Sequence, residues 1–240
     1  MKKLLRMANK MDGNFGYSKS FHSFAADLED METADRIKQK AHDLVMQYGI
    51  RSVSMDDIAG ALGMSKKTIY QYFSDKDELV EAVIKDKIDE NQSLCLKDKD
   101  KAKDAIHEVF LAIEMMQEMF ANMNPSIISD MEKFHPRSYA IFHQHKYNFL
   151  YKVLRENIDR GIAEELYRPD INTEILIKAR LETMMLPFNQ QVYPKNKYRL
   201  IDVEVELTEH FLFGLSTAKG HKLILKYQQE RIKKYGHEKK

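Results

Sequence analysis

Residues 65–72 carry side chains that could together bind a polyanion. On one expected surface lie two lysines, several hydroxyls and an amide, namely Ser65, Lys66, Lys67, Thr68, Tyr70, Gln71 and Tyr72. Ammonium and hydroxyl groups bind phosphates, and lysine and glutamine side chains can contact base edges in the major groove of DNA. Because this set holds no carboxylate, its composition suits double-stranded DNA.

Two short helices joined by a tight turn would position this surface. Ser54 followed by Asp57 predicts a capping box at the start of the first of them. Gly63 can adopt the positive φ that the turn requires, and Ile69 and Phe73 would anchor the second helix to a core. The pattern is typical of a helix-turn-helix. A helical hairpin that only packs is the alternative, and it would rarely expose a basic face free of carboxylates.

Longer helices flank this pair. A first helix is expected to begin at Thr33 and to end at Gly49, with one apolar face formed by Ile37, Ala41, Leu44, Val45 and Tyr48. Ser74 and Asp75 predict the start of a fourth helix, whose apolar residues are Leu79, Val80, Val83, Ile84 and Ile88.

A charged run, KDKDKAK at residues 97–103, follows the fourth helix. It offers nothing to a core, so it is interpreted as a linker and as the boundary between two domains. Helical spacing continues beyond it, with breaks at three prolines, Pro125, Pro136 and Pro187. No alternating strand pattern rises above noise, and the chain is therefore predicted to be all-α.

Four segments are expected along the chain. Residues 1–30 would be a weakly ordered extension, and residues 31–90 the helix-turn-helix domain. Residues 91–218 would form a second helical domain, and residues 219–240 a basic helix or tail that Gly220 separates from it. The tail has a net charge of +6, which we interpret as a solvated helix end rather than as an additional DNA contact.

Composition limits the classes of function. Lys and Arg total 38 against 37 Asp and Glu, so binding of nucleic acid through bulk charge is excluded. The acids of residues 34–90 that lie in the first helix and at the far end of the fourth are expected to face away from DNA. The single cysteine, Cys95, excludes an intrachain disulfide, and no apolar stretch is long enough to span a membrane. A cytoplasmic protein without a cofactor or a metal is predicted.

Residues 34–85 resemble the DNA-binding domain of the TetR/AcrR family of bacterial transcriptional regulators. The resemblance is carried by Ile37, Ala41, the run Ser54-Met-Asp-Asp-Ile-Ala, the run Gly63-Met-Ser-Lys-Lys-Thr-Ile-Tyr-Gln-Tyr-Phe and the run Ser74-Asp-Lys-Asp-Glu-Leu. Lys67 stands where the family often has glycine, which adds a charge at the groove. The resemblance implies that the third helix enters the major groove and that the fourth connects it to an all-helical ligand-binding and dimerisation domain.

The resemblance also implies roles for individual residues. Ser54 and Lys76 would bind phosphates from the second and fourth helices, and Lys67 and Gln71 would read bases. Phosphates or flanking bases would be contacted by Lys66, Thr68, Tyr70 and Tyr72. Because one short helix reads only a few base pairs, two copies would be needed on a palindrome.

Residues of a segment rich in methionine and aromatic side chains are the candidate lining of an effector cavity: Ile113, Met116, Phe120, Phe142, His145 and Phe149. Methionine side chains repack around varied ligands, which favours a largely apolar small molecule. Ordinary core packing is the alternative at each position. His143 and His145 are two residues apart and would point to different helix faces, so a shared metal site is not expected.

A stripe closer to the C-terminus is the candidate dimer interface: Ile175, Ala179, Val203, Leu207, Phe211 and Gly214. Small residues such as Gly214 permit close approach of helices, although an internal core explains the stripe equally well. The resulting hypothesis is a homodimeric repressor that a small molecule releases from its operator. A family member that activates transcription or that responds to no ligand is the alternative. A helical carrier or enzyme is a further one, but no nucleophile–base pair, metal cluster or glycine-rich phosphate loop supports it.

Overall fold

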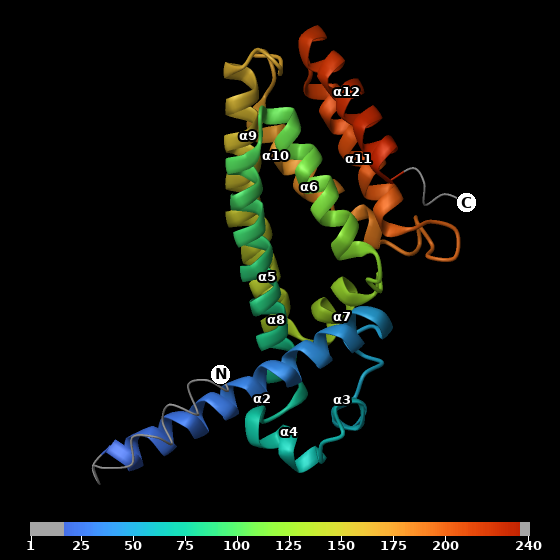
Figure 1. Ribbon diagram of the computed structural model, residues 1–240. Coiled ribbons are helices and arrows are strands. Elements are labelled where there is room, and N and C mark those ends of the chain that lie inside the picture. Colours follow the sequence, from blue (N-terminus) through green and yellow to red (C-terminus); the bar gives the residue numbers. More distant parts are fainter. Residues whose placement is uncertain (1–16, 236–240) are drawn as a thin grey trace.

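The structure, a computed structural model, describes residues 17–235, and for residues 17–29 and Tyr235 it gives the backbone alone. Within this range the chain is helical, and extended backbone pairs only in an isolated bridge between Tyr167 and Ser216. The all-α prediction is therefore confirmed. Figure 1 shows α2, α3 and α4 in a small unit at one end of the molecule, with a longer helical bundle above it. None of the helices in the described part of the chain is long and apolar enough to cross a membrane.

The small unit (the N-terminal unit) contains α2 (Tyr17–Tyr48), α3 (Met55–Leu62) and α4 (Lys66–Tyr72). A single apolar core joins these helices and includes Ile37, Ala41, Val45, Ile58, Ala59, Ile69 and Phe73. Ile69 is completely buried, so α4 docks through one side and leaves its other side exposed. Helices as short as α3 and α4 are unstable alone, and burial of their apolar side chains is what holds them in place.

The first helix starts earlier than the sequence predicts. α2 begins at Tyr17, and Thr33 lies inside it, so the predicted start at Thr33 is wrong. No glycine or proline occurs within α2, and nothing in the local sequence therefore ends the helix on its N-terminal side. Residues 17–30, which the sequence assigns to a weakly ordered extension, are part of α2, while residues 1–16 lie outside the described residues. The predicted end is confirmed, since Gly49 follows α2 with a φ of 87°.

α5 (Lys76–Lys101) belongs to both parts of the molecule. Four apolar side chains near its start enter the core of the N-terminal unit: Leu79, Val80, Val83 and Ile84. The helix then continues along the bundle (Figure 1). The predicted linker at 97–103 is therefore wrong for the part that lies within α5. Its charges are solvated or paired at the end of the helix, where Lys99 binds Glu156 at 2.6 Å.

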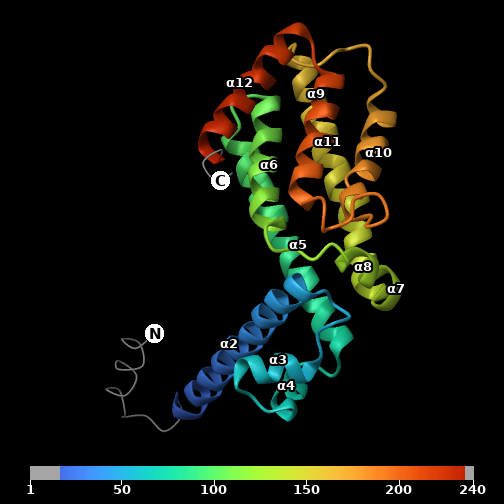
Figure 2. The same cartoon turned by 90° about the vertical axis from the view of Figure 1, so that its right-hand side faces the viewer.

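The bundle has a core of its own. It is formed by α6 (Ala105–Phe120), α9 (Tyr151–Ala163), α10 (Thr173–Thr183), α11 (Leu200–Leu215) and α12 (Ala218–Tyr235). The buried residues of this second core include Ile106, Phe110, Ile113, Ile158, Ile177, Leu181 and Leu212. Figure 2 shows α10 and α11 on one side of the bundle and α12 beside α6 on the other. A short 3₁₀ helix, η2 (Leu186–Phe188), follows α10 and contains the predicted break at Pro187.

The chain returns from the bundle to the N-terminal unit between α6 and α9. The elements of this return are α7 (Ile127–Phe134), α8 (Pro136–Gln144) and the π-helical turn η1 (His145–Leu150). Ile127 and Met131 of α7 are buried in the core of the N-terminal unit. Just before α7, the backbone N–H of Asn124 donates to the carbonyl oxygen of Met46 near the end of α2, at 2.6 Å. A boundary at residue 91 therefore does not separate the two cores, because α7 contributes to the first of them.

Gly220 does not separate the tail from the bundle, and this prediction is wrong. The break lies at Ser216, which ends α11, and Gly220 is buried within the first turn of α12. A Cβ at Gly220 would lie 2.2 Å from the carbonyl oxygen of Leu166. Glycine is therefore needed here for the close approach of two backbone segments, a requirement that a sequence pattern does not distinguish from a helix break.

Candidate nucleic-acid interface

α3 begins at the predicted capping box. The Asp57 carboxylate accepts hydrogen bonds from the Ser54 hydroxyl at 2.6 Å and from the Ser54 backbone N–H at 2.8 Å. The backbone N–H of Asp57 in turn donates to the Ser54 hydroxyl at 3.1 Å. The two bonds from Ser54 hold the pKa of Asp57 below its usual value. The Ser54 hydroxyl is thus engaged in the cap, and its contact with a phosphate stays a prediction.

The turn between α3 and α4 has the geometry that its sequence predicts. Gly63 ends α3 in the left-handed region, with a φ of 65° and a ψ of 26°. Ser65 then caps α4, because its hydroxyl accepts a hydrogen bond from the backbone N–H of Thr68 at 3.1 Å. The hydroxyls of Ser65 and Thr68 also lie 2.8 Å apart. These two residues fix the first turn of α4, and their contacts with DNA remain predictions.

The outer side of α4 presents the side chains that are predicted to read bases. Lys67 and Gln71 are both exposed, and they lie four residues apart, so they are neighbours on the helix surface. Tyr70 is 43% exposed beside them. Figure 1 shows α3 and α4 at the end of the molecule that is farthest from the bundle. The bundle of the same protomer therefore does not obstruct the approach of a duplex to α4.

Two carboxylates contact side chains of this surface, and neither belongs to the acids that the sequence expectation places away from DNA. Asp56 of α3 binds the Lys66 ammonium at 2.8 Å. Asp30 of α2 accepts a hydrogen bond from the Tyr72 hydroxyl at 3.0 Å, which raises the pKa of Tyr72. These contacts join residues 10 and 42 positions apart in sequence, and only the packing of the helices brings them together. In the sequence, the capping box at Ser54 indicates the position of Asp56, because it places this residue in the exposed first turn of α3.

Lys76 is held by the protein itself. Its ammonium donates to the carbonyl oxygen of Ile50 at 2.6 Å, and partial burial lowers its pKa. This bond fixes the start of α5 to the segment between α2 and α3. A phosphate could bind Lys76 only after that bond is broken, so this geometry does not favour the predicted phosphate contact.

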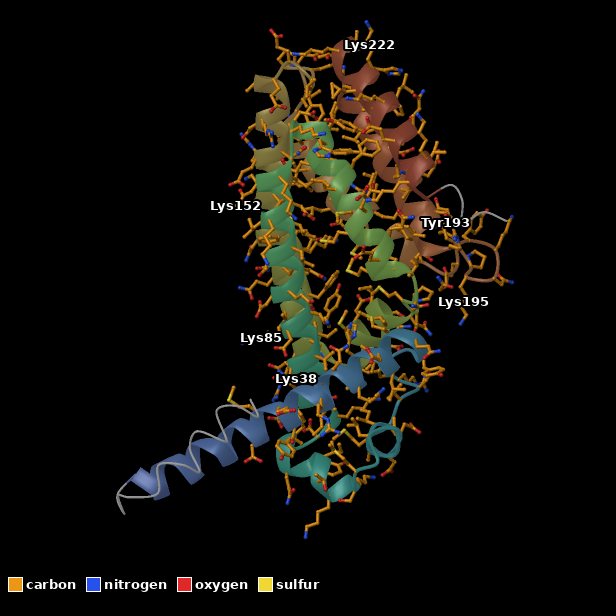
Figure 3. The ribbon with its side chains drawn as sticks, viewed as in Figure 1. Lys38, Lys85, Lys152, Tyr193, Lys195 and Lys222 are labelled. Atoms are coloured by element: carbon orange, nitrogen blue, oxygen red, sulfur yellow. The ribbon has the colours of Figure 1, made fainter. Side chains whose placement is uncertain are left out.

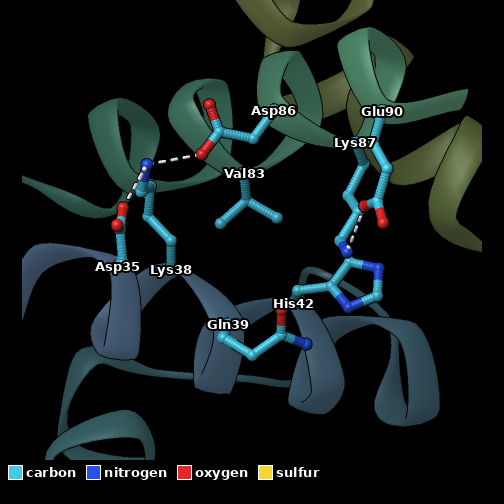
Figure 4. Close-up of a pocket in the computed structure, with 8 residues that line it drawn as sticks. All are labelled: Asp35, Lys38, Gln39, His42, Val83, Asp86, Lys87 and Glu90. Atoms are coloured by element: carbon cyan, nitrogen blue, oxygen red, sulfur yellow. Dashed lines mark hydrogen bonds and ion pairs between the residues drawn. The ribbon is translucent and has the colours of Figure 1, made fainter. Parts of the chain in front are cut away.

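A cavity of about 220 Å³ lies between α2 and α5. It is lined by Asp35, Lys38, Gln39, His42, Val83, Asp86, Lys87 and Glu90 (Figure 4). Most of its charges neutralise one another, since Lys38 binds Asp35 at 3.0 Å and also binds Asp86, and Lys87 binds Glu90 at 2.7 Å. None of the residues that the sequence assigns to DNA, effector or dimer contacts lines this cavity.

The candidate effector residues are divided between the two cores. Ile113 and Met116 of α6 are buried in the bundle core, and Phe120 packs against the same core. Phe142 of α8 packs instead against the core of the N-terminal unit. A molecule that contacted all four side chains would therefore lie where the two cores meet. Their use as a pocket stays a prediction.

The two remaining effector candidates, His145 and Phe149, lie on η1. The His145 ring stacks on Phe149 with their centroids 5.4 Å apart, and its Nδ1 lies 3.0 Å from the amide of Gln92. Burial lowers the pKa of His145. His143 faces elsewhere, with its ring 4.4 Å from that of Tyr147, so the expectation that the two histidines point apart is confirmed. Among the described residues no group of three His, Cys, Asp or Glu side chains could hold a metal ion.

The candidate dimer residues differ in exposure. Those that are exposed or half-buried in the protomer are Ile175, Ala179, Leu207, Phe211 and Gly214. Ile175 is 62% exposed, so its side chain is available to a second copy. Val203 is only 6% exposed, so it could not contact a second copy without rearrangement.

The basic tail lies far from α4. Figure 3 shows Lys222 of α12 at the end of the molecule opposite to α3 and α4. Other cations of α12 are paired within the bundle, since Lys234 binds Glu114 at 2.8 Å and Arg231 binds Glu209 at 2.7 Å. This placement agrees with the interpretation of the tail as a helix on the bundle and not as an additional DNA contact beside α4.

Comparison with known sequences places the helix-turn-helix in a family. The profile described as bacterial regulatory proteins, tetR family, matches residues 37–83. An uncharacterized HTH-type transcriptional regulator, YvaF, from Bacillus subtilis (strain 168) is 33% identical over 110 residues, which make up 42% of this chain and 53% of that protein. The chain thus spans about half the length of this curated relative.

Solved structures share most of the fold. A transcriptional regulator of the TetR family from Agrobacterium tumefaciens superposes with a TM-score of 0.66 at 16% identity, covering 78% of this chain and 100% of that one. A regulator from Saccharomonospora viridis, described as putative and solved in complex with choline, superposes with a TM-score of 0.65 at 16% identity, covering 78% and 99%. At such identities the likeness shows the fold alone.

The profile match, the sequence relative and the shared fold agree with one another. The sequence relative from Bacillus subtilis and the neighbour from Agrobacterium tumefaciens are both named as regulators of transcription. The matched residues 37–83 contain α3, the turn at Gly63 and α4. Residues 37–83 of this chain therefore form a helix-turn-helix domain of the kind found in the TetR family of bacterial regulatory proteins.

Proposed function

We propose that the protein is a homodimeric repressor that binds a palindromic operator through α4 of each protomer. The observation that carries this proposal is the exposed face of α4, where Lys67 and Gln71 point to solvent while Ile69 anchors the helix. A helix that is fixed on its inner side and carries a lysine and an amide on its outer side can read base edges in a major groove.

Two copies are required for selective binding. α4 is seven residues long, so one copy contacts only a few base pairs, and a two-fold dimer doubles the contacts on a palindrome. The exposed apolar residues of α10 and α11 support a dimer interface on that side of the bundle, with Ile175 and Phe211 as its apolar contacts and Gly214 at the close approach.

A largely apolar small molecule is proposed to release the repressor. It would bind among the residues of α6, α8 and η1 named above, where the bundle core and the core of the N-terminal unit meet. α5 runs through both parts, and α7 packs into the N-terminal unit, so a change in the bundle would move α4. The choline complex of the Saccharomonospora viridis neighbour supports a ligand-binding role for this fold.

DNA binding is tested by selecting duplexes from a random library with the full chain. We expect a palindromic consensus whose binding weakens with salt at a log–log slope of about −4. Lys66 and Lys67 of two protomers give four phosphate or base contacts, whereas Lys76 is bound to the carbonyl oxygen of Ile50.

Lys67→Ala and Gln71→Ala should change the selected consensus, each costing about 1–3 kcal/mol at its position. Lys66→Ala should weaken all sequences alike. Selections in which both base-reading variants keep the wild-type consensus would contradict the assignment.

Release is tested by calorimetric titration of an apolar compound that raises the melting temperature. Its affinity for the protein–operator complex should be lower than for the free protein by a coupling of about 1–3 kcal/mol. By reciprocity the compound must weaken operator binding by the same factor. Equal affinities in the two titrations would show that the compound is not an effector.

A further inference from the structure

Asp56 is a carboxylate in the surface that would face DNA. It lies in the first turn of α3, its side chain is 65% exposed, and its Oδ2 is 2.8 Å from the Nζ of Lys66. Lys66 is the first residue of α4, and its side chain is 50% exposed. The Nζ also lies 6.0 Å from the centroid of the Tyr70 ring. The Lys66 ammonium is thus placed between a carboxylate and an aromatic ring, all of them open to solvent.

The ion pair is not needed to build the helix-turn-helix. The cap of α3 is made by Ser54 and Asp57, and α4 is anchored by the buried Ile69. Exposed ion pairs of this kind contribute little to folding. An acid in the first turn does interact favourably with the helix dipole of α3, but Asp57 already occupies that turn. Placing a second carboxylate beside phosphates therefore has a cost that folding does not explain.

We infer that Asp56 limits the affinity of α4 for DNA, because it holds Lys66 in an ion pair that must break before Lys66 binds a phosphate. The inference rests on the proposed DNA-binding function. Nonspecific binding consists almost entirely of contacts between cations and phosphates, so a lysine already paired with a carboxylate adds little to it. On an operator, the base contacts of Lys67 and Gln71 would hold α4 in the groove. A fixed phosphate then replaces the Asp56 carboxylate on Lys66.

The expected consequence is that Asp56→Asn binds both random and operator DNA more tightly. This variant frees one lysine per protomer, and so two per dimer, for nonspecific contacts. Binding to a duplex of random sequence should tighten by about tenfold, and its log–log salt slope should steepen by about two. Operator affinity should rise by about the same factor, because the wild type must break the Asp56–Lys66 pair before Lys66 binds a phosphate there, whereas the variant has no such pair.

Fluorescence anisotropy of the full chain measures both affinities over a range of KCl concentrations, using a random-sequence duplex and the duplex that the wild type selects. Asp159→Asn is the matched control. It makes the same chemical change in an exposed ion pair, Arg155–Asp159 at 3.0 Å, but on α9 in the bundle. Asp56→Ala gives a second variant with the same change in charge, and circular dichroism checks that each variant is folded.

The double variant Asp56→Asn/Lys66→Ala tests the mechanism. If Asp56 acts through Lys66, the gain on random DNA disappears in the double variant. A gain that persists without Lys66, or one that Asp159→Asn reproduces, would overturn the inference. A gain on random DNA with no gain on the operator would also overturn it, since Lys66 would then not leave Asp56 for a phosphate on the operator.

Failure of the inference can be told apart from failure of the proposed function. If the wild type selects an operator but Asp56→Asn behaves like wild type on both duplexes, only the role of Asp56 is rejected. If the wild type selects no sequence and shows no preference over random DNA, the proposed function is rejected and the inference with it.

Discussion

Gly214→Arg is expected to convert the protein from a dimer to a monomer and to weaken operator binding by about a hundredfold or more. Gly214 is exposed in the protomer, and a Cβ placed there meets no atom within 4 Å. An arginine therefore fits the isolated protomer without strain. In a two-fold dimer that covers α11, it would bury unpaired guanidinium groups at a close helix approach, which is strongly unfavourable. Sedimentation and gel-shift measurements on the same preparations test both effects.

Leu225→Arg is the matched control for this experiment. Leu225 is 43% exposed on α12, so the substitution adds the same charge to the bundle at a site outside the proposed interface. It should leave both mass and operator affinity unchanged. A wild type that is monomeric at micromolar concentration, or a Gly214→Arg variant that stays dimeric, would reject α10 and α11 as the interface. Dissociation by Leu225→Arg alone would place the interface on α12.

The helix-turn-helix is the part of the fold that the sequence determines most directly. Its caps involve residues close together in the chain, such as Ser54 with Asp57 and Ser65 with Thr68. The turn at Gly63 requires a left-handed conformation that glycine adopts without strain. Because each of these signals is local, residue types and spacing were sufficient to predict α3, α4 and the exposed face of α4.

Contacts between distant residues were not predictable in the same way. A lysine at a helix start suggests a phosphate contact, but the carbonyl of Ile50 that binds Lys76 lies 26 residues away. The charged run at 97–103 suggests a linker, yet most of it is helical because its lysines and acids are solvated or paired. In both cases helix packing determines the partner, which the residue type alone does not specify.

The candidate dimer interface shows a second limit of prediction from sequence. Helical spacing groups Val203 with Leu207, Phe211 and Gly214, but it does not say which side a neighbouring helix covers. Within the protomer Val203 is buried, whereas Gly214 is open. The spacing also does not predict the buried ion pair between Arg180 of α10 and Glu204 of α11, because arginine and glutamate usually lie at the surface.

This ion pair gives the largest expected effect on stability. Arg180 and Glu204 are 4% and 1% exposed, and Arg180 also donates to the hydroxyl of Thr208 at 2.6 Å. Arg180→Met is expected to lower the free energy of unfolding by about 3–5 kcal/mol at neutral pH, because it leaves Glu204 buried without its partner. Urea unfolding at a fixed protein concentration measures this loss.

The loss should depend on pH in a defined direction. Burial raises the pKa of Glu204, although Arg180 and Thr208 act to lower it. Without Arg180 this pKa rises further above the value of about 4.3 in the unfolded chain. A carboxyl whose pKa is raised by folding favours the folded state below its unfolded pKa, and this contribution is lost as pH rises through the folded pKa. The cost of Arg180→Met should therefore be small near pH 4 and should grow toward neutral pH.

The double variant Arg180→Met/Glu204→Gln separates the charge from the packing. Removing both charges should restore most of the stability that Arg180→Met loses, since buried ion pairs contribute little over neutral residues of similar size. The difference between the double variant and Arg180→Met alone should vanish toward pH 4, where Glu204 is protonated in both states.

Lys178→Met is the control on the same helix. Lys178 pairs with Glu174 at 2.7 Å in solvent, so its loss should lower the free energy of unfolding far less. Equal, pH-independent losses in the Arg180 and Lys178 variants would show that the Arg180–Glu204 pair is hydrated in solution and does not hold α10 against α11.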